Sequence, residues 1–257
     1  MPTLTENKIE EFAIKLLKDY GYQYIYGPNI APDGKTPERS SHDQVLLIDR
    51  LRKAIQHINP ELTSETHEAA LKDIQRITSP DLTANNETFH RYLTEGIPVS
   101  TTVEGEERGD QVWLIDFQNP LKNDYLVVNQ FTVVEHGNNK RPDVALFVNG
   151  IPLVVFELKN AADENATIHN AFNQIETYKS VIPSLFTYNG FIVISDGLEA
   201  KAGTISSGFT RFMTWRTEDG ETEASQLVSQ LETLIKGMLN PSTLLDLIRH
   251  FIVFEKS

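Results

Sequence analysis

The chain has 257 residues, of which 40% are hydrophobic and 23% charged, so its composition is that of a globular protein and excludes a disordered or fibrous one. Its 23 basic and 36 acidic residues give a net charge of −13, which excludes a protein that grips nucleic acid with its whole surface. It has no cysteine, which excludes disulfides, thiolate metal sites and cysteine nucleophiles.

The amino-terminal part, roughly the first 95 residues, is predicted to be mostly helical. An apolar stripe at helical spacing, which includes Phe12 and Tyr20, predicts a first helix whose apolar face packs inward. Thr3 and Glu6 can form a capping box at its start, and Gly21 ends it. Further helices are expected over three ranges, at about 43–58, 65–77 and 86–93.

The middle of the chain is predicted to form strands, because runs of β-branched and aromatic residues alternate with turn-forming residues. Five strands are expected, at about 99–103, 111–117, 125–134, 144–148 and 153–159. After them we expect a helix at about 167–179, strands at 191–195 and 212–215, and closing helices near 223–239 and 244–254. Loops are expected at 27–40 and 200–208. This order predicts an α/β (α+β) protein with a mixed β-sheet.

Two familiar sequence signals do not lead to a site. Gly34-Lys35-Thr36 resembles the end of a phosphate-binding loop, but Asn29 stands where that motif needs glycine, and nearby prolines oppose a helix start, so we predict a surface loop. The histidines form no H-E-x-x-H pair and no G-x-S-x-G motif is present. We expect His57 and His250 to be ordinary surface or packing residues.

The segment from Arg141 to Lys159 carries the residues that indicate a functional site. It is predicted to form two strands joined by a turn at Asn149-Gly150, with Asp143 opening the first strand. Glu157 and Lys159 lie near the end of the second strand, and the two-residue period of a strand places both on one face.

The register of this hairpin decides whether the first acid joins the second. A strict two-residue turn pairs residues whose numbers sum to 299 and sets Asp143 opposite Phe156, on the wrong face. If Ile151 belongs to the loop, or a bulge adds a residue, the pairs sum to 300 and Asp143 lies opposite Glu157. Pro152, which cannot donate to a ladder, favours the second register, and we predict the pairing of Asp143 with Glu157.

Two carboxylates in a half-buried site repel each other unless a cation or a proton intervenes, and oxygen ligands suit Mg²⁺. Such an ion clamps a phosphate oxygen and activates water, while Lys159 can orient or deprotonate that water or neutralise the developing charge. Lys140 and Arg141 add local positive charge to the acidic chain. The competing interpretation is a cross-strand ion pair on an exposed face.

A second group of residues lies on the helix that follows the hairpin. Gln174 and Tyr178 are four residues apart and therefore share one face of that helix, beside an apolar stripe formed by Ile168, Ala171, Phe172 and Ile175. Without further information, a solvated glutamine and a tyrosine at the edge of the core explain them equally well.

The spaced set PD, ELK and QIETY resembles the PD-(D/E)XK nuclease superfamily, in the form that has a Q-x-x-x-Y motif. More specifically, four segments resemble the amino-terminal nuclease region of the restriction (R) subunit of type I restriction-modification enzymes: LTENKIEEFAIKLLKDYGY, VNQFTVVEHGNNKRPDVALFVNGIPLVVFELKN, AFNQIETYK and RFMTWRT. The resemblance covers nearly the whole chain. It implies a restriction-endonuclease-like mixed sheet flanked by helices, with a helical amino-terminal part.

The resemblance also implies roles for individual residues. Asp143 and Glu157 would bind Mg²⁺, which Mn²⁺ can replace, and Lys159 would be the catalytic lysine. The backbone carbonyl of Leu158 would be a further metal ligand, and Glu6 or Glu10 of the first helix would be a further acid. The residues that would support the DNA or the active site are Gln174, Tyr178 and Arg141.

The domain organisation and partners follow from the same resemblance. Residues 1–220 would be the endonuclease domain, with a helical part at about 1–95 and a sheet core at about 97–216, and residues 221–257 would lead toward an absent motor region. ATP-driven translocation would belong to the full-length subunit alone. The implied partners are double-stranded DNA and the methyltransferase (M) and specificity (S) subunits, the latter reading the DNA sequence. With no visible signal peptide or apolar run of ~18 residues, a cytoplasmic protein that does not enter a membrane is expected.

Two alternatives to a nuclease were considered. The first is a non-catalytic module that uses a nuclease-like fold to dock onto DNA or a neighbouring motor, with its acids serving only as surface charge. The second, a two-carboxylate glycosidase, is disfavoured because Lys159 would depress the pKa of a carboxyl group that must stay protonated.

Overall fold

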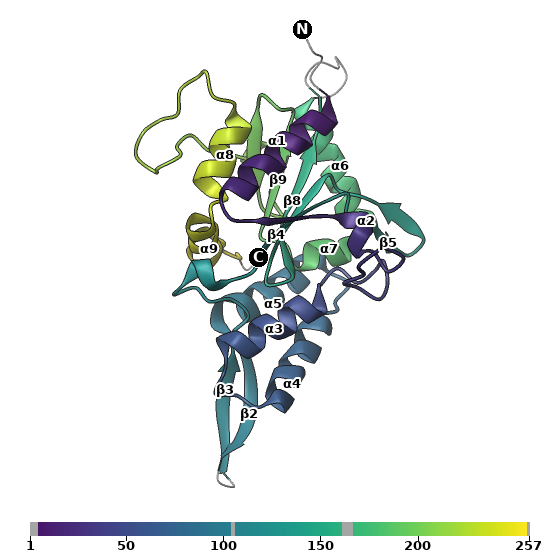
Figure 1. Ribbon diagram of the computed structural model, residues 1–257, viewed down its shortest axis with the longest axis vertical. Coiled ribbons are helices and arrows are strands. Elements are labelled where there is room, and N and C mark those ends of the chain that lie inside the picture. Colours follow the sequence, from purple (N-terminus) through teal and green to yellow (C-terminus); the bar gives the residue numbers. More distant parts are fainter. Residues whose placement is uncertain (1–4, 104–105, 161–166, 256–257) are drawn as a thin grey trace.

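A six-stranded mixed sheet forms the centre of the computed structural model, which describes residues 5–103, 106–160 and 167–255 (Figure 1). Its strand order is β1-β4-β7-β8-β9-β10; β1 runs parallel to β4 and β8 parallel to β9, whereas the other neighbours are antiparallel. The strands are β1 (Gln23–Tyr26), β4 (Tyr125–Asn129), β7 (Val144–Val148), β8 (Ile151–Leu158), β9 (Phe191–Ser195) and β10 (Ala200–Gly203). The predicted mixed α/β architecture is confirmed.

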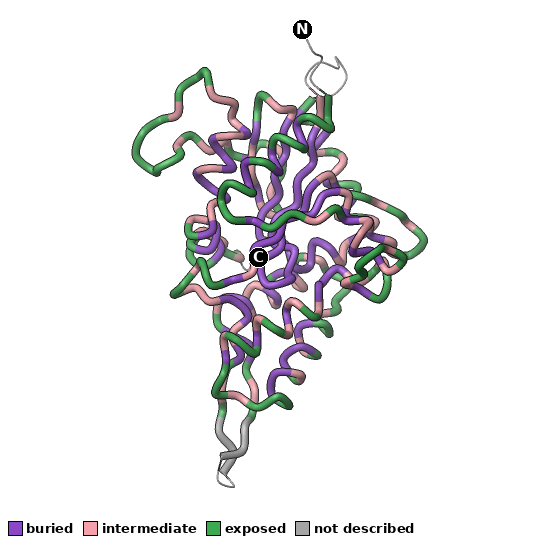
Figure 2. The backbone as a smooth tube through the Cα atoms, in the orientation of Figure 1, coloured by how far each residue is buried: buried purple, intermediate pink, exposed green. Residues whose placement is uncertain are grey.

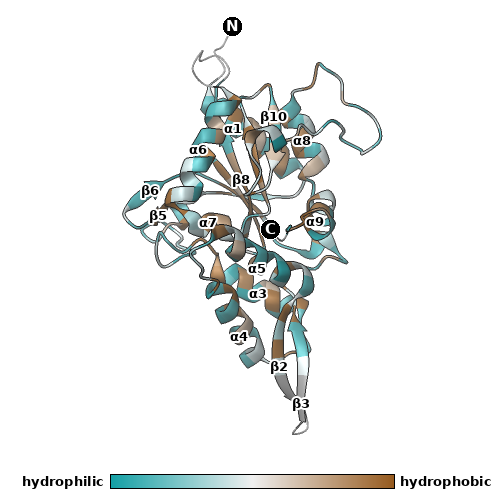
Figure 3. Cartoon of the chain, turned by 180° about the vertical axis from the view of Figure 1, so that it is seen from behind, coloured by the Kyte–Doolittle hydropathy of each residue, from teal (hydrophilic) through white to brown (hydrophobic). Residues whose placement is uncertain are grey.

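The middle of the sheet is apolar on both faces. Every residue of β4, β7, β8 and β9 is buried (Figure 2), and β8 is correspondingly hydrophobic in Figure 3. Near-continuous apolar runs of this kind need helices on both sides. The helices α1 (Glu6–Asp19) and α8 (Gln230–Met238) cover one face, and α6 (Ile168–Val181) and α7 (Pro183–Thr187) cover the other.

A helical lobe lies below the sheet in Figure 1. It contains α3 (Ile48–Ile58), α4 (Ser64–Gln75) and α5 (Leu82–Glu95), followed by a hairpin of β2 (Ile97–Val103) and β3 (Glu106–Val112). The side-chain amide of Asn86, on α5, joins the lobe to the core by donating to the carbonyls of Phe186, Thr187 and Asn189. The β2–β3 hairpin forms its own two-stranded sheet outside the central one, and β3 lies earlier in the chain than the strand expected at about 111–117.

The first helix lies where it was predicted, with two corrections. Thr5 is its N-cap, and Thr3, the predicted capping residue, lies outside the described residues. Phe12 and Tyr20 were expected to pack inward but are 38% and 36% exposed, because they flank the buried stripe and lie outside it. Gly21 ends the helix as predicted, with a φ of +91° that glycine adopts without strain.

Several other expected boundaries also differ from the structure. The helix predicted from residue 43 begins only at Ile48, because the residues before it form a turn and a bend and Leu47 N–H donates to the Gly150 carbonyl. The helix predicted from 223 begins at Gln230, capped by Ser229. The remaining elements are α2 (Gly27–Ile30), η1 (Pro120–Lys122), β5 (Val133–Glu135), β6 (Asn138–Lys140), η2 (Phe209–Arg211) and α9 (Pro241–His250).

The sheet gains two edge strands that the sequence pattern did not predict. β10 lies in the stretch expected to be a loop, whereas the strand expected at 212–215 is reduced to a single bridge between Met213 and Ala202. β1 has four residues, of which only Ile25 is even partly buried, so it lacks the apolar run typical of a strand.

The loop around Lys35 and two histidines lie at the surface, as the sequence predicts. No helix starts at Lys35, which lies in a loop as expected, and His57 and His250 are exposed on α3 and α9. None of the helices in the described ranges has the length and apolarity needed to cross a bilayer.

Candidate functional site

A β-bulge in the β7–β8 hairpin sets the register of the site. Next to the turn, Val148 pairs with Ile151, so partners sum to 299, but beyond the bulge Val144 pairs with Phe156, so partners sum to 300. Leu153 is the extra residue on β8. The bulge alternative for the register is therefore confirmed, whereas Ile151 is a strand residue and not part of the loop. One more step along this ladder sets Asp143 opposite Glu157.

The turn that joins the two strands has the predicted chemistry. Asn149 and Gly150 have φ values of +53° and +81°, which the two central residues of a type I′ turn require. A side chain at Gly150 would lie 2.5 Å from the Leu47 carbonyl oxygen, so only glycine fits against the amino-terminal end of α3.

Three polar head groups meet at the far end of this hairpin, and we call them the carboxylate corner: Asp143, Glu157 and Lys159. The Lys159 ammonium donates to Glu157 Oε1 at 2.6 Å and to the Leu158 carbonyl oxygen at 3.3 Å. Asp143 Oδ2 accepts a hydrogen bond of 2.7 Å from the backbone N–H of Leu158. The structure thus brings the three predicted side chains and the predicted backbone carbonyl together.

The corner is a poor environment for two negative charges. Glu157 is only 2% exposed, and burial, together with the nearby Asp143 carboxylate, raises its pKa to about 8. Burial also raises the pKa of Asp143 to about 6, although the Leu158 N–H and Lys159 oppose the shift. Burial lowers the pKa of Lys159, but the two carboxylates raise it by more, so the ammonium form is favoured. The single positive charge of Lys159 therefore does not balance the negative charges that Asp143 and Glu157 would carry if both were ionised.

Glu157 also has an oxygen with no partner. Its Oε2 atom is buried and has no partner of hydrogen-bond geometry among the described residues, although the nearby Tyr178 hydroxyl opposes the rise in the pKa of Glu157, whereas Oε1 is bound by Lys159. A buried carboxylate oxygen is costly to leave unpaired, so each such atom in a native structure needs an explanation. A cation held by this oxygen, Asp143 and the Leu158 carbonyl would provide one, because oxygen-only ligands suit Mg²⁺. Within the described ranges, no group of three or more His, Asp or Glu side chains is arranged to hold a metal ion.

The helix α6 borders the corner with the two residues singled out from its sequence. Gln174 Nε2 donates to the Tyr178 hydroxyl at 2.9 Å, so the two side chains form one unit along the helix face. Burial and the nearby Glu157 carboxylate raise the pKa of Tyr178 well above its usual value. Tyr178 is thus buried next to the corner, and Gln174 lies one turn farther from it, partly exposed.

The helix α1 carries two acids that act on the corner electrostatically. Glu6 and Glu10, the two candidates, both raise the pKa of Asp143 through their negative charge. Glu6 is exposed, whereas Glu10 is 9% exposed and both of its oxygens are bound. Its Oε1 accepts from the side-chain amide of Asn129 at 2.6 Å, and its Oε2 from that of Gln130 at 2.8 Å.

Asn129 and Gln130 were missed by the sequence analysis. Asn129 ends β4, and Gln130 follows it with a φ of +55°, which does not fit the strand predicted through residue 134. Their amides orient Glu10 across more than a hundred residues of sequence, a contact that no local pattern reveals. Arg141, the predicted supporting cation, is exposed and lines a neighbouring groove along α1 and β1.

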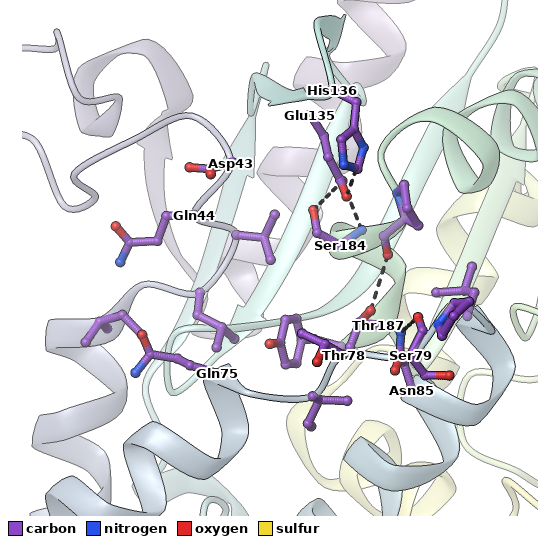
Figure 4. Close-up of a pocket in the computed structure, with 18 residues that line it drawn as sticks. Asp43, Gln44, Gln75, Thr78, Ser79, Asn85, Glu135, His136, Ser184 and Thr187 are labelled. Atoms are coloured by element: carbon purple, nitrogen blue, oxygen red, sulfur yellow. Dashed lines mark hydrogen bonds and ion pairs between the residues drawn. The ribbon is translucent and has the colours of Figure 1, made fainter.

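A second hollow lies away from the corner, where the helical lobe meets α7 and β5 (Figure 4). Val45, Leu46 and Tyr188 give it apolar walls, and on its rim the Ser184 hydroxyl donates to Glu135 Oε2 at 2.7 Å. No residue of the carboxylate corner lines this cleft. The cleft is therefore separate from the candidate site.

Comparisons with known proteins agree with the geometry. Residues 3–211 match the family model described as "Type I restriction enzyme R protein N terminus". The chain is 37% identical over 256 residues to the type I restriction enzyme HindI endonuclease subunit of Haemophilus influenzae, covering 98% of this chain and 24% of that protein. It is also 37% identical over 245 residues to the putative type I restriction enzyme MjaIXP endonuclease subunit of Methanocaldococcus jannaschii, covering 93% of this chain and 23% of that protein. The chain thus spans about a quarter of the length of these curated relatives.

Proposed function

This chain belongs to the family of type I restriction enzyme R protein N termini, and we propose that its carboxylate corner hydrolyses phosphodiester bonds of double-stranded DNA with Mg²⁺ as cofactor. Mn²⁺ would substitute for Mg²⁺. The observation that carries the proposal is the buried, unpartnered Oε2 of Glu157 beside the Asp143 carboxylate. Selection for stability alone would not retain a buried and a half-buried acid beside a single ammonium.

The proposed division of labour follows from the contacts. The Asp143 carboxylate, Glu157 Oε2 and the Leu158 carbonyl would hold the divalent cation, which supplies a Lewis acid for the phosphate oxygens. Glu10, with its two amide donors, is the better placed of the two acids on α1 because it is buried and its charge acts on Asp143. The Leu158 N–H fixes one Asp143 oxygen, which limits the rotation of that side chain.

Lys159 is proposed to act through its positive charge. Its ammonium lies 2.6 Å from Glu157, at the edge of the corner, where it can stabilise the negative charge that grows on the phosphate during water attack. Tyr178 and Gln174 would then hold the opposite wall of the site, with the Tyr178 ring excluding water behind Glu157.

The larger assembly is proposed from the family alone. We infer that cleavage occurs without sequence preference of its own, because DNA recognition would belong to a specificity subunit that acts with methyltransferase subunits. ATP-driven translocation would belong to the remainder of a full-length R subunit, since the relatives are about four times as long as this chain.

Metal binding by the chain tests the proposal without relying on activity. Titration calorimetry with Mn²⁺ should show saturable binding that Asp143→Ala and Glu157→Ala remove, because each variant loses a carboxylate ligand. Glu176→Ala, which removes an acid from the outer side of α6, is the matched control and should bind as the unaltered chain does. Well-folded protein that binds no Mn²⁺ would favour the non-catalytic docking module.

Cleavage is tested in a full-length R subunit assembled with M and S subunits. Asp143→Ala, Glu157→Ala and Lys159→Ala should each abolish double-strand cutting and leave ATP hydrolysis intact, because the corner serves only the cutting step. Gln174→Ala and Tyr178→Ala should slow cutting. Undiminished cutting by the three corner variants would refute the assignment of the site.

A further inference from the structure

A groove runs beside the carboxylate corner along α1 and the edge strand β1. It has a volume of about 560 Å³, within the range of roughly 300–1,000 Å³ usual for pockets that bind small molecules. Glu10, Gln130 and Arg141 line it, and the backbone N–H of Gln130 donates to the Asp143 carbonyl oxygen at 3.1 Å. The groove therefore adjoins the proposed site of cleavage.

Two exposed aromatic rings stand along this groove. Tyr24 and Tyr26 are 40% and 44% exposed and both line the groove, whereas the residue between them, Ile25, is partly buried against the core. Alternation along a strand sets the two tyrosines on one face, about 6.6 Å apart along β1. Exposed aromatic pairs of this kind cost solubility, so their placement next to a candidate site indicates a binding role.

The first ring is held in place before any ligand arrives. The Tyr24 hydroxyl donates to Asn129 Oδ1 at 3.1 Å, and the same Asn129 side chain donates to Glu10. A ring tethered at its hydroxyl loses little freedom on binding and keeps its face open for stacking. The tether also connects the groove wall to the acid proposed for the active site.

The charges along the groove are mixed. Lys15, Lys18 and Arg141 line it, and the two lysines are one helical turn apart on α1. Glu11 and Asp19 line it as well, so the groove does not attract a duplex through bulk positive charge. Aromatic faces with a few positioned cations are the pattern used for single strands, whose bases are free to stack.

We propose that this groove holds an unpaired DNA strand next to the phosphate to be cut, with bases stacked on Tyr24 and Tyr26 and phosphates near Lys15 and Lys18. The proposal rests on the proposed nuclease function for the identity of its ligand. It means that the strand enters the site locally separated from its complement, so frayed or strand-separated DNA is the preferred substrate.

The test is equilibrium binding of the 257-residue chain in EDTA, where no cleavage occurs, to a fluorescent oligothymidylate of about 12 nucleotides and to a duplex of equal length. The single strand should bind more tightly. Tyr24→Leu and Tyr26→Leu should each weaken its binding by roughly 5- to 150-fold, the equivalent of one lost stacked base. Tyr26→Phe, which keeps the ring, should bind normally.

Matched controls separate stacking from folding and charge. Tyr20→Leu removes a tyrosine that directly follows α1, is 36% exposed and does not line the groove, and it should have no effect. Changing Lys15 and Lys18 together to Ala should reduce the slope of log affinity against log salt by about 1.4, the value for two single-strand phosphates. Lys53→Ala, at an exposed position on α3, should leave the slope unchanged.

The outcomes distinguish this inference from the proposed function. The proposed role of the groove would be refuted if the Tyr24→Leu and Tyr26→Leu chains bind the single strand normally, or if the unaltered chain shows no binding at low salt. Neither result would affect the cleavage assays. Conversely, the tyrosine variants could lose strand binding while the corner variants still cleave DNA. That result would support the binding role of the groove and refute the assignment of the nuclease site. Photo-crosslinking of 5-iododeoxyuridine to Tyr24 or Tyr26 provides an independent readout that does not depend on variant stability.

Discussion

The substitution Glu157→Gln should stabilise the folded chain in the absence of metal. Glu157 is 2% exposed, and burial raises its pKa from 4.5 to about 8. Between these values the folded chain keeps a proton that the unfolded chain releases, so the wild-type free energy of unfolding falls as pH rises. Glutamine has nearly the same shape and does not titrate, so the variant does not experience this loss.

The magnitude follows from the shift. One proton bound in the folded state alone changes stability by about 1.4 kcal/mol per pH unit. From about pH 5 to about pH 7 the variant should therefore gain ~3 kcal/mol on the wild-type chain, with little reduction by solvent because the carboxylate is buried. Because Glu157 carries its proton over this range, glutamine, like the neutral acid, offers an uncharged oxygen that accepts from the Lys159 ammonium.

Urea denaturation in EDTA at several pH values between about 5 and 7 measures this difference. Added Mg²⁺ should reverse the order, because a cation bound only by the folded wild-type chain stabilises it by mass action and the variant lacks the charged ligand. If the difference in free energy of unfolding between the two chains does not change with pH, Glu157 is not protonated in the folded chain. The argument that one ammonium does not balance the two acids of the corner would then fail as well.

Two further predictions concern the scaffold, and both are measured as free energies of unfolding by urea denaturation. Gly150→Ala should destabilise the chain by about 1–3 kcal/mol, because φ is +81° and the added carbon would lie 2.5 Å from the Leu47 carbonyl oxygen, whereas Gly109→Ala, with open space around it, should be nearly neutral. Asn86→Ala should cost about 1–3 kcal/mol because the carbonyls of α7 and the following turn lose their amide donor; an unchanged stability would show that α5 is not tied to the core there.

The parts of the structure that the sequence predicted well are those with strong local patterns. The runs at 144–148 and 153–159 are apolar enough to be buried on both faces, and β7 and β8 lie there within two residues. The convergence of Glu157 and Lys159 follows from the two-residue strand period alone, and their head groups are 2.6 Å apart. The register was predicted from Pro152 as a residue that can start a strand, but β8 begins at Ile151, and the shift comes instead from the bulge at Leu153.

The parts that were missed depend on contacts across the chain. β1 is a strand because it lies parallel to β4, about a hundred residues later, and its own sequence lacks an apolar alternation. The clamp of Asn129 and Gln130 on Glu10 has the same origin. Phe12 and Tyr20 were assigned to the core from spacing, yet spacing does not say how wide the buried stripe is.

Because of the extra residue in β8, the face of the sheet on which each acid lies depends on whether the number of residues between the turn and that acid is odd or even. Leu153 puts the two ends of the strand out of phase, so that the acid near the mouth of the hairpin meets its partner although the tight turn alone would have turned it away. A one-residue insertion or deletion between Asn149 and Glu157 would preserve every charged residue and still point the carboxylate into the wrong layer. Surface loops usually tolerate insertions and deletions of any length. In this hairpin only changes of two residues at a time would keep the acids on the same face.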